Sequence, residues 1–143
     1  MVQQLLVALY VMAVCVVIHA IGLATALRRL RRQAATTNVW ALCWLFVRLA
    51  AWMVLLHLAE ITAWGLVYVW RGALGDMTAA LYFSAVTYTT TGYGDLVLPA
   101  EWRLVGAVEA LTGILMSGWS TGFFFAVVNR LFEMNARPAV RIS

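Results

Sequence analysis

The chain has 143 residues, of which 64% are hydrophobic and 11% charged, with a formal net charge of +4. A soluble domain would be about half apolar and about a quarter charged. A domain of this size cannot bury the excess of apolar residues in one core. The composition therefore excludes both a soluble globular protein and a disordered chain. The basic residues are ten arginines, too scattered for a nucleic-acid-binding stripe, and we expect no nucleic-acid partner. The chain is therefore expected to be embedded in membrane lipid.

Three apolar stretches are long enough to cross a bilayer as helices, which takes about 20 residues. They span 5–27, 39–70 and 100–130. The first has no basic segment before it and exceeds the apolar core of a signal peptide, so we expect a retained helix rather than a cleaved signal. A shorter apolar stretch within 76–88 cannot span and suits a re-entrant helix.

Arginines set the expected orientation, because short loops rich in arginine stay on the cytoplasmic side. One group follows the first helix and the other lies toward the end of the chain: Arg28, Arg29, Arg31 and Arg32, then Arg130, Arg137 and Arg141. We therefore expect a multi-pass protein of the cell membrane, with its N-terminus outside and its C-terminus in the cytoplasm. Segment 76–101 should face outside.

The segment after the re-entrant helix reads TYTTTGYGD over 87–95. Irregular backbone at membrane depth is tolerated only where it is buried in protein or lines water. Gly92 and Gly94 can adopt positive φ, which most residues resist, and such glycines alternating with ordinary residues can turn successive carbonyls to one side. A row of inward carbonyls replaces the hydration shell of a K⁺ ion. The segment therefore predicts an ion-selectivity filter.

The pattern TxxTxGYGD resembles the potassium channel family in its two-helix pore-domain form, over about residues 44–130. The resemblance implies a homotetramer, because one chain supplies one filter strand and the ring needs four. The implied filter residues are Thr90, Thr91, Gly92, Tyr93, Gly94 and Asp95. K⁺ would be held at Thr90, Thr91, Gly92 and Tyr93.

The expected fold is an all-α integral membrane protein with three transmembrane helices, a re-entrant pore helix, a filter loop and a homotetrameric pore. An extra transmembrane helix and a basic cytoplasmic loop should occupy 1–38, the pore domain 39–132 and a short cytoplasmic tail 133–143. Within the pore domain we expect an outer helix at 39–70, a pore helix at 76–88, the filter at 90–95 and an inner helix at 100–130. The extra helix should lie against the outer side of the second helix.

Two features of the filter surroundings depart from the family pattern. The family usually has Val or Ile where this chain has Thr91, and that side chain is expected to point away from the ions. Many members carry a carboxylate at the position of Val86 and a Trp at that of Phe83, which assist the residue matched by Asp95. Asp95 must therefore find another partner or stand in water at the outer mouth.

The inner helix carries the expected pore-lining residues. Gly113 matches a glycine that serves as a hinge in the family, although close helix packing by a small residue explains it equally well. Ser117, Thr121 and Phe125 continue at helical spacing and should face the ion path. Phe125 is a candidate dewetting gate.

Three ionisable residues lie within the apolar helices at similar expected depths: His57, Glu60 and Glu109. His57 and Glu60 are three residues apart and share a helix face. An ionisable group at membrane depth is a functional hypothesis by default. The cluster could be a static network that braces the helices, or it could share protons and change gating.

The leading functional hypothesis is a K⁺-selective channel that conducts passively. The alternatives are a weakly selective cation channel of the same fold and a non-conducting membrane scaffold. We do not expect an enzyme, because the histidines and cysteines lie in apolar helices without a nucleophile–base pair, and the two cysteines show no metal-binding spacing. The expected partners are identical subunits, lipid and permeant K⁺, with no cofactor and no regulatory domain attached to this chain.

Overall fold

The computed structural model describes residues 2–31 and 38–136, which form helices joined by loops. The helices are α1 (Val2–Arg31), α2 (Val39–Trp70), α3 (Met77–Tyr88) and α4 (Arg103–Ala136), with a 3₁₀ turn at Ala100–Trp102 before α4. Three of them, α1, α2 and α4, are long and apolar enough to cross a membrane. The prediction of an all-α membrane protein is confirmed.

Two helices are longer than the apolar stretches from which they were predicted. The helix expected at 5–27 begins at Val2 and ends at Arg31, and the inner helix runs past 130 to Ala136. Polar residues therefore continue both helices beyond the apolar stretch. Several residues of the orientation argument, Arg32, Arg137 and Arg141, lie outside the described residues, as does most of the tail expected at 133–143.

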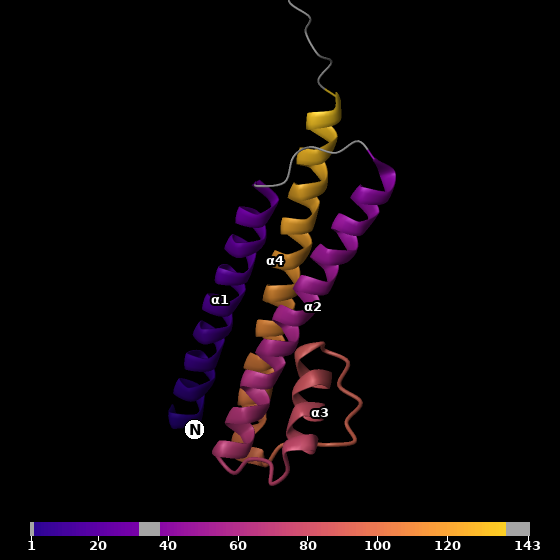
Figure 1. Cartoon of the computed structure of the whole chain (residues 1–143). Helices are drawn as coiled ribbons and strands as arrows, with labels where there is room; N and C mark the ends of the chain where they lie inside the picture. The colour runs from indigo at the N-terminus through magenta and orange to yellow at the C-terminus, as the bar shows by residue number, and fades with distance from the viewer. Residues whose placement is uncertain (1, 32–37, 137–143) are drawn as a thin grey trace, which may run out of the picture.

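The three long helices form an elongated bundle, and α3 lies at one end of it, beside α2 and α4 (Figure 1). Helix α1 packs along both α2 and α4. The expectation that α1 lies against the outer side of α2 is therefore incomplete. Gly22 permits this approach, because side-chain atoms of Leu56 lie 2.4 Å from the place that a Cβ would occupy. Trp52 Nε1 also donates to the Gly22 carbonyl, at 3.0 Å.

The short helix α3 is fixed at its start and along its buried side. Asp76 caps its N-terminus by accepting from the Ala79 amide at 2.8 Å, the role that aspartate commonly has at this position. Ser84 donates to the Ile61 carbonyl of α2 at 2.8 Å, and Phe83 contacts Tyr68 edge-on. These contacts hold α3 in one orientation and so position the loop that follows it.

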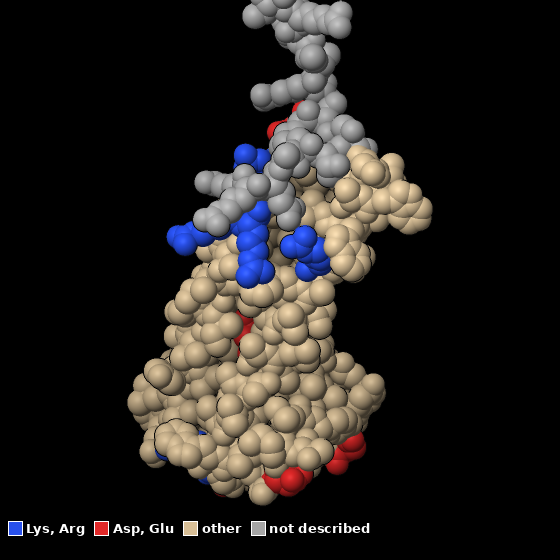
Figure 2. All heavy atoms as spheres, in the orientation of Figure 1, with Lys and Arg blue, Asp and Glu red and all other residues tan. Residues whose placement is uncertain are grey.

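Charged side chains gather mainly at the two ends of the bundle, and the band between them is uncharged apart from one small acidic patch (Figure 2). Arginines cluster near the end where α1 finishes and α2 begins. Acidic side chains gather mainly at the opposite end, where α3 lies. The band carries many exposed large hydrophobic residues, as lipid-facing surfaces do.

Candidate functional site

The loop after α3 has a backbone of alternating handedness. Thr90, Gly92 and Gly94 have φ values of 59°, 53° and 77°, whereas Thr91 and Tyr93 between them do not have positive φ. Thr90 is the only non-glycine residue with positive φ in the described part of the chain. Only glycine visits this region without steric cost. The two glycines therefore permit a backbone that can present successive carbonyls on one side.

The base of this loop is tied to the last turn of α3. The Gly92 amide donates to the Val86 carbonyl at 3.0 Å, and the Thr90 amide donates to Thr87 at 2.9 Å. The Thr91 hydroxyl, which departs from the family pattern, is 3.0 Å from the Thr89 hydroxyl. Thr91 thus has a hydrogen-bond partner within the loop.

Asp95 finds its partner in Tyr82 of α3. The Tyr82 hydroxyl donates to Asp95 Oδ2 at 2.6 Å, and the Leu96 amide donates to Oδ1 at 3.1 Å. This bond raises the pKa of Tyr82 above its usual range, so the phenol stays protonated and donating at neutral pH. Tyr82 lies one helical turn before Val86, where many members of the family have a carboxylate.

Gly113 does not share a face with the other expected pore-lining residues. Ser117, Thr121 and Phe125 are exposed on α4, whereas Gly113 is buried. A Cβ on Gly113 would lie 1.9 Å from the carbonyl oxygen of Tyr88, the last residue of α3. Close packing against the C-terminal end of α3 is therefore what separates Gly113 from these exposed residues.

Glu109 is separate from the other two members of the predicted polar cluster. Tyr68 donates to Glu109 Oε2 at 2.7 Å, and Ser84 Oγ lies 2.5 Å from Oε1, so that its one hydrogen is shared between Glu109 and the Ile61 carbonyl. All three residues are buried, and Glu109 belongs to α4, Tyr68 to α2 and Ser84 to α3. Glu109 therefore links α3 to α2 and α4, while the expected group of His57, Glu60 and Glu109 divides into two.

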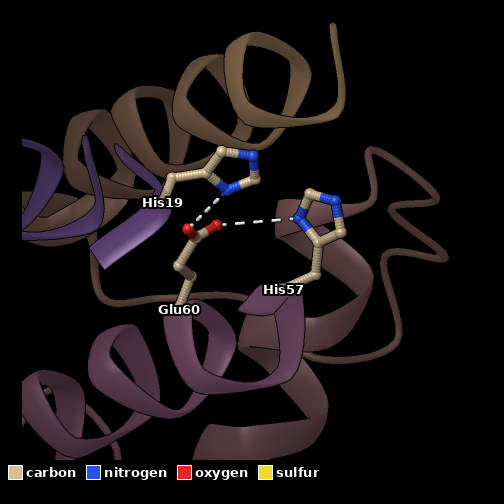
Figure 3. Close-up of side chains that lie close together, drawn as sticks. All are labelled: His19, His57 and Glu60. Atoms are coloured by element: carbon tan, nitrogen blue, oxygen red, sulfur yellow. Dashed lines mark hydrogen bonds and ion pairs between the residues drawn. The ribbon is translucent and has the colours of Figure 1, made fainter. Parts of the chain in front are cut away.

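The second group surrounds Glu60, and we call it the Glu60 cluster: His19, His57, Glu60, Tyr88 and Ser120. His19 Nδ1 is 2.8 Å from Glu60 Oε1, and His57 Nδ1 is 3.6 Å from Oε2 (Figure 3). The Tyr88 hydroxyl donates to Glu60 Oε2, and its oxygen lies 3.0 Å from His57 Nδ1. Ser120 Oγ is 3.2 Å from the Nε2 atom of each imidazole.

This cluster joins all four helices, because its members come from α1, α2, α3 and α4. Sequence reasoning missed His19, Tyr88 and Ser120. His19 did carry a signal, since a polar side chain in an apolar helix needs a partner inside the protein. Its partner could not be identified, because Glu60 is 41 residues away along the chain.

A family model described as "Ion channel" matches residues 6–130. The match begins near the start of α1 and ends in α4, so it extends further toward the N-terminus than the resemblance over 44–130. No curated protein and no solved structure matches the chain significantly.

Proposed function

Because the chain belongs to the ion channel family, we propose that it is a K⁺-selective channel that conducts passively through a homotetrameric pore. The alternating backbone at Thr90, Gly92 and Gly94 carries the proposal. Potassium filters replace the hydration shell of the ion with rings of backbone carbonyls. The loop has this alternating handedness, and it directly follows a short helix that lies between two candidate spanning helices in the chain. Both features support a role as a potassium filter.

The exposure of the loop supports the assembly of four chains. Residues 89–95 are exposed in the single chain, and the Tyr93 side chain is 72% exposed. Four copies around an axis would cover these surfaces and line one ion path. The C-terminal end of α3 carries a partial negative charge, which favours a cation if that end points to the axis.

Two hydrogen bonds compensate for the two departures of the filter surroundings from the family pattern. The Tyr82–Asp95 bond supplies a brace at the outer mouth, and the Thr89–Thr91 contact satisfies the additional hydroxyl. Both favour a filter that keeps its shape. They support the selective channel over the weakly selective one.

The proposal is tested with purified protein in liposomes. A K⁺ gradient should drive flux, and the reversal potential under a K⁺/Na⁺ gradient should follow the K⁺ equilibrium potential. A reversal potential near zero would instead identify a weakly selective cation channel. Tetramers without any ion flux would identify a scaffold.

Phe125 is the candidate gate, and Phe125→Ala should raise the resting K⁺ flux. Its side chain is 65% exposed in the single chain, so four copies can meet on the axis and dewet the inner mouth. Phe124→Ala is the matched control, because the Phe124 ring packs against Phe46 of α2 and should not act as a gate. Equal resting flux in wild type and Phe125→Ala would remove Phe125 from this role.

The proposed orientation places the α3 end outside and the arginine-rich end in the cytoplasm. In a Cys43→Ser background, which removes the exposed thiol while Cys15 stays buried, an impermeant maleimide should label Thr78→Cys on intact cells. Glu133→Cys should react only after permeabilisation. Both positions are exposed. The reverse pattern of labelling would overturn the orientation.

A further inference from the structure

Two imidazoles and a carboxylate converge inside the bundle, between α1 and α2 (Figure 3). One potential ligand atom from each of His19, His57 and Glu60 lies within 4.8 Å of the others. We propose that these three residues bind one divalent transition-metal ion of the zinc type. Two histidines and one carboxylate are a common ligand set for zinc and for non-haem iron.

The spacing of the ligand atoms fits such an ion. Bonds of about 2.0–2.2 Å to nitrogen and oxygen place neighbouring ligand atoms of a tetrahedral site roughly 3.3 Å apart. His19 Nδ1 lies 2.8 Å from Glu60 Oε1, and His57 Nδ1 lies 3.6 Å from the other carboxylate oxygen, Oε2. These two values lie on either side of the tetrahedral spacing, with one imidazole beside each oxygen of the carboxylate.

The outer nitrogens of both rings share one partner, which constrains where the protons lie. Ser120 Oγ is 3.2 Å from His19 Nε2 and from His57 Nε2. Its single proton can go to Met53 Sδ, 3.5 Å away, where sulfur is the acceptor. With an ion bound, both Nε2–H groups would donate to Ser120 and both Nδ1 lone pairs would face the ion, whereas without it His19 Nδ1–H donates to Glu60 Oε1. A cation between these three electron-pair donors stabilises the arrangement.

The same contacts complete the surroundings of a metal site. Histidine ligands usually donate their second N–H to a fixed oxygen, which orients the ring, and Ser120 offers that oxygen to both. Tyr88 donates to the carboxylate ligand. Ion binding would thus fasten α1 to α2 directly, and to α4 and the pore helix through Ser120 and Tyr88.

Burial closes the cluster on most sides and leaves it partly open at His57. His19 and Glu60 are 0% exposed, whereas the His57 side chain is 21% exposed. A buried carboxylate is costly unless a cation or hydrogen bonds compensate it, and the ion supplies that compensation. The competing explanation is a metal-free ion pair between histidine and glutamate, which is an outcome of the test.

The test is a titration of detergent-solubilised protein with Co²⁺, followed by displacement with Zn²⁺. The protein must lack a polyhistidine tag and carry Cys43→Ser, because the chain contains only two histidines and the exposed thiol would compete. We expect one Co²⁺ per chain, with the visible absorption of a four- or five-coordinate site that Zn²⁺ removes. No saturable binding at millimolar Co²⁺ would overturn the proposal and leave the metal-free ion pair.

Three variants assign the bound ion to these residues. His57→Gln and Glu60→Gln should abolish the visible band, and Ser120→Ala should weaken binding about 10–100-fold, as loss of an outer partner does. Ser117→Ala, an exposed serine of the same helix, should bind as wild type. Wild-type affinity in folded His57→Gln or in Ser120→Ala would overturn the site, and Ser120→Ala decides it if the ligand variants fail to assemble. Because the readout is equilibrium binding, it is independent of ion conduction.

Discussion

Gly92→Ala should abolish K⁺ flux while the protein still inserts and assembles. The φ of Gly92 is +53°, and nothing lies within 4 Å of the place that a Cβ would occupy. In the single chain the obstacle is therefore the backbone conformation, which costs an L-residue roughly 1–2 kcal/mol. An alanine that relaxes to negative φ would break the alternation of the filter and turn a carbonyl away from its neighbours. Flux from liposomes and gel filtration measure the two outcomes.

Gly75→Ala is the matched control for this prediction. Gly75 also has free space around the Cβ position, but its φ is not positive, so alanine should be tolerated there and flux should stay near wild type. Retained K⁺ flux in Gly92→Ala would end the assignment of 90–95 as the filter. A loss of flux in both variants would show only that glycine replacement near the pore helix is harmful.

Gly113→Ala should destabilise the assembly and lower flux together. The new methyl group would lie 1.9 Å from the Tyr88 carbonyl oxygen and 2.8 Å from its carbon, so α4 and the end of the pore helix must move apart. Overpacking of this kind costs typically about 1–3 kcal/mol. The shift would also displace the residue that leads into the filter. Thermal unfolding of the assembled protein in detergent measures the loss of stability.

Gly118→Ala separates packing from hinge motion. Nothing lies within 4 Å of a Cβ at Gly118 in the single chain, yet alanine stiffens a helix at either position because it restricts the backbone. If Gly113 acts through packing, only Gly113→Ala should lower the melting temperature. An unchanged melting temperature in Gly113→Ala, with altered open probability, would restore the hinge interpretation.

Sequence alone predicted the elements whose signal is local. The spanning helices follow from the length and apolarity of single stretches, and the loop after α3 follows from consecutive residues. Each of these depends on positions within a few residues of one another, so no knowledge of tertiary packing was needed.

Helix contacts could not be predicted in the same way. A membrane helix is apolar on all sides, because lipid and protein interior are equally nonpolar, so hydrophobic periodicity does not indicate which face packs. The placement of α1 against α4 depends on His19 and Ser120, which are 101 residues apart. The separation of Glu109 from Glu60 depends on Tyr68 and Ser84, two polar residues whose bonds to Glu109 could not be predicted from the sequence.

The Tyr82–Asp95 bond lies within one chain, and this has a consequence for channels assembled from unlike subunits. In a concatenated tetramer each Tyr82→Phe subunit would lose its own brace and leave the other three intact. Inactivation of the filter, measured as loss of K⁺ conduction, should then increase with each additional mutant subunit. A brace shared between neighbours would instead make the effect depend on whether mutant subunits are adjacent or diagonal. Concatemers carrying two mutant subunits in either arrangement should therefore behave alike.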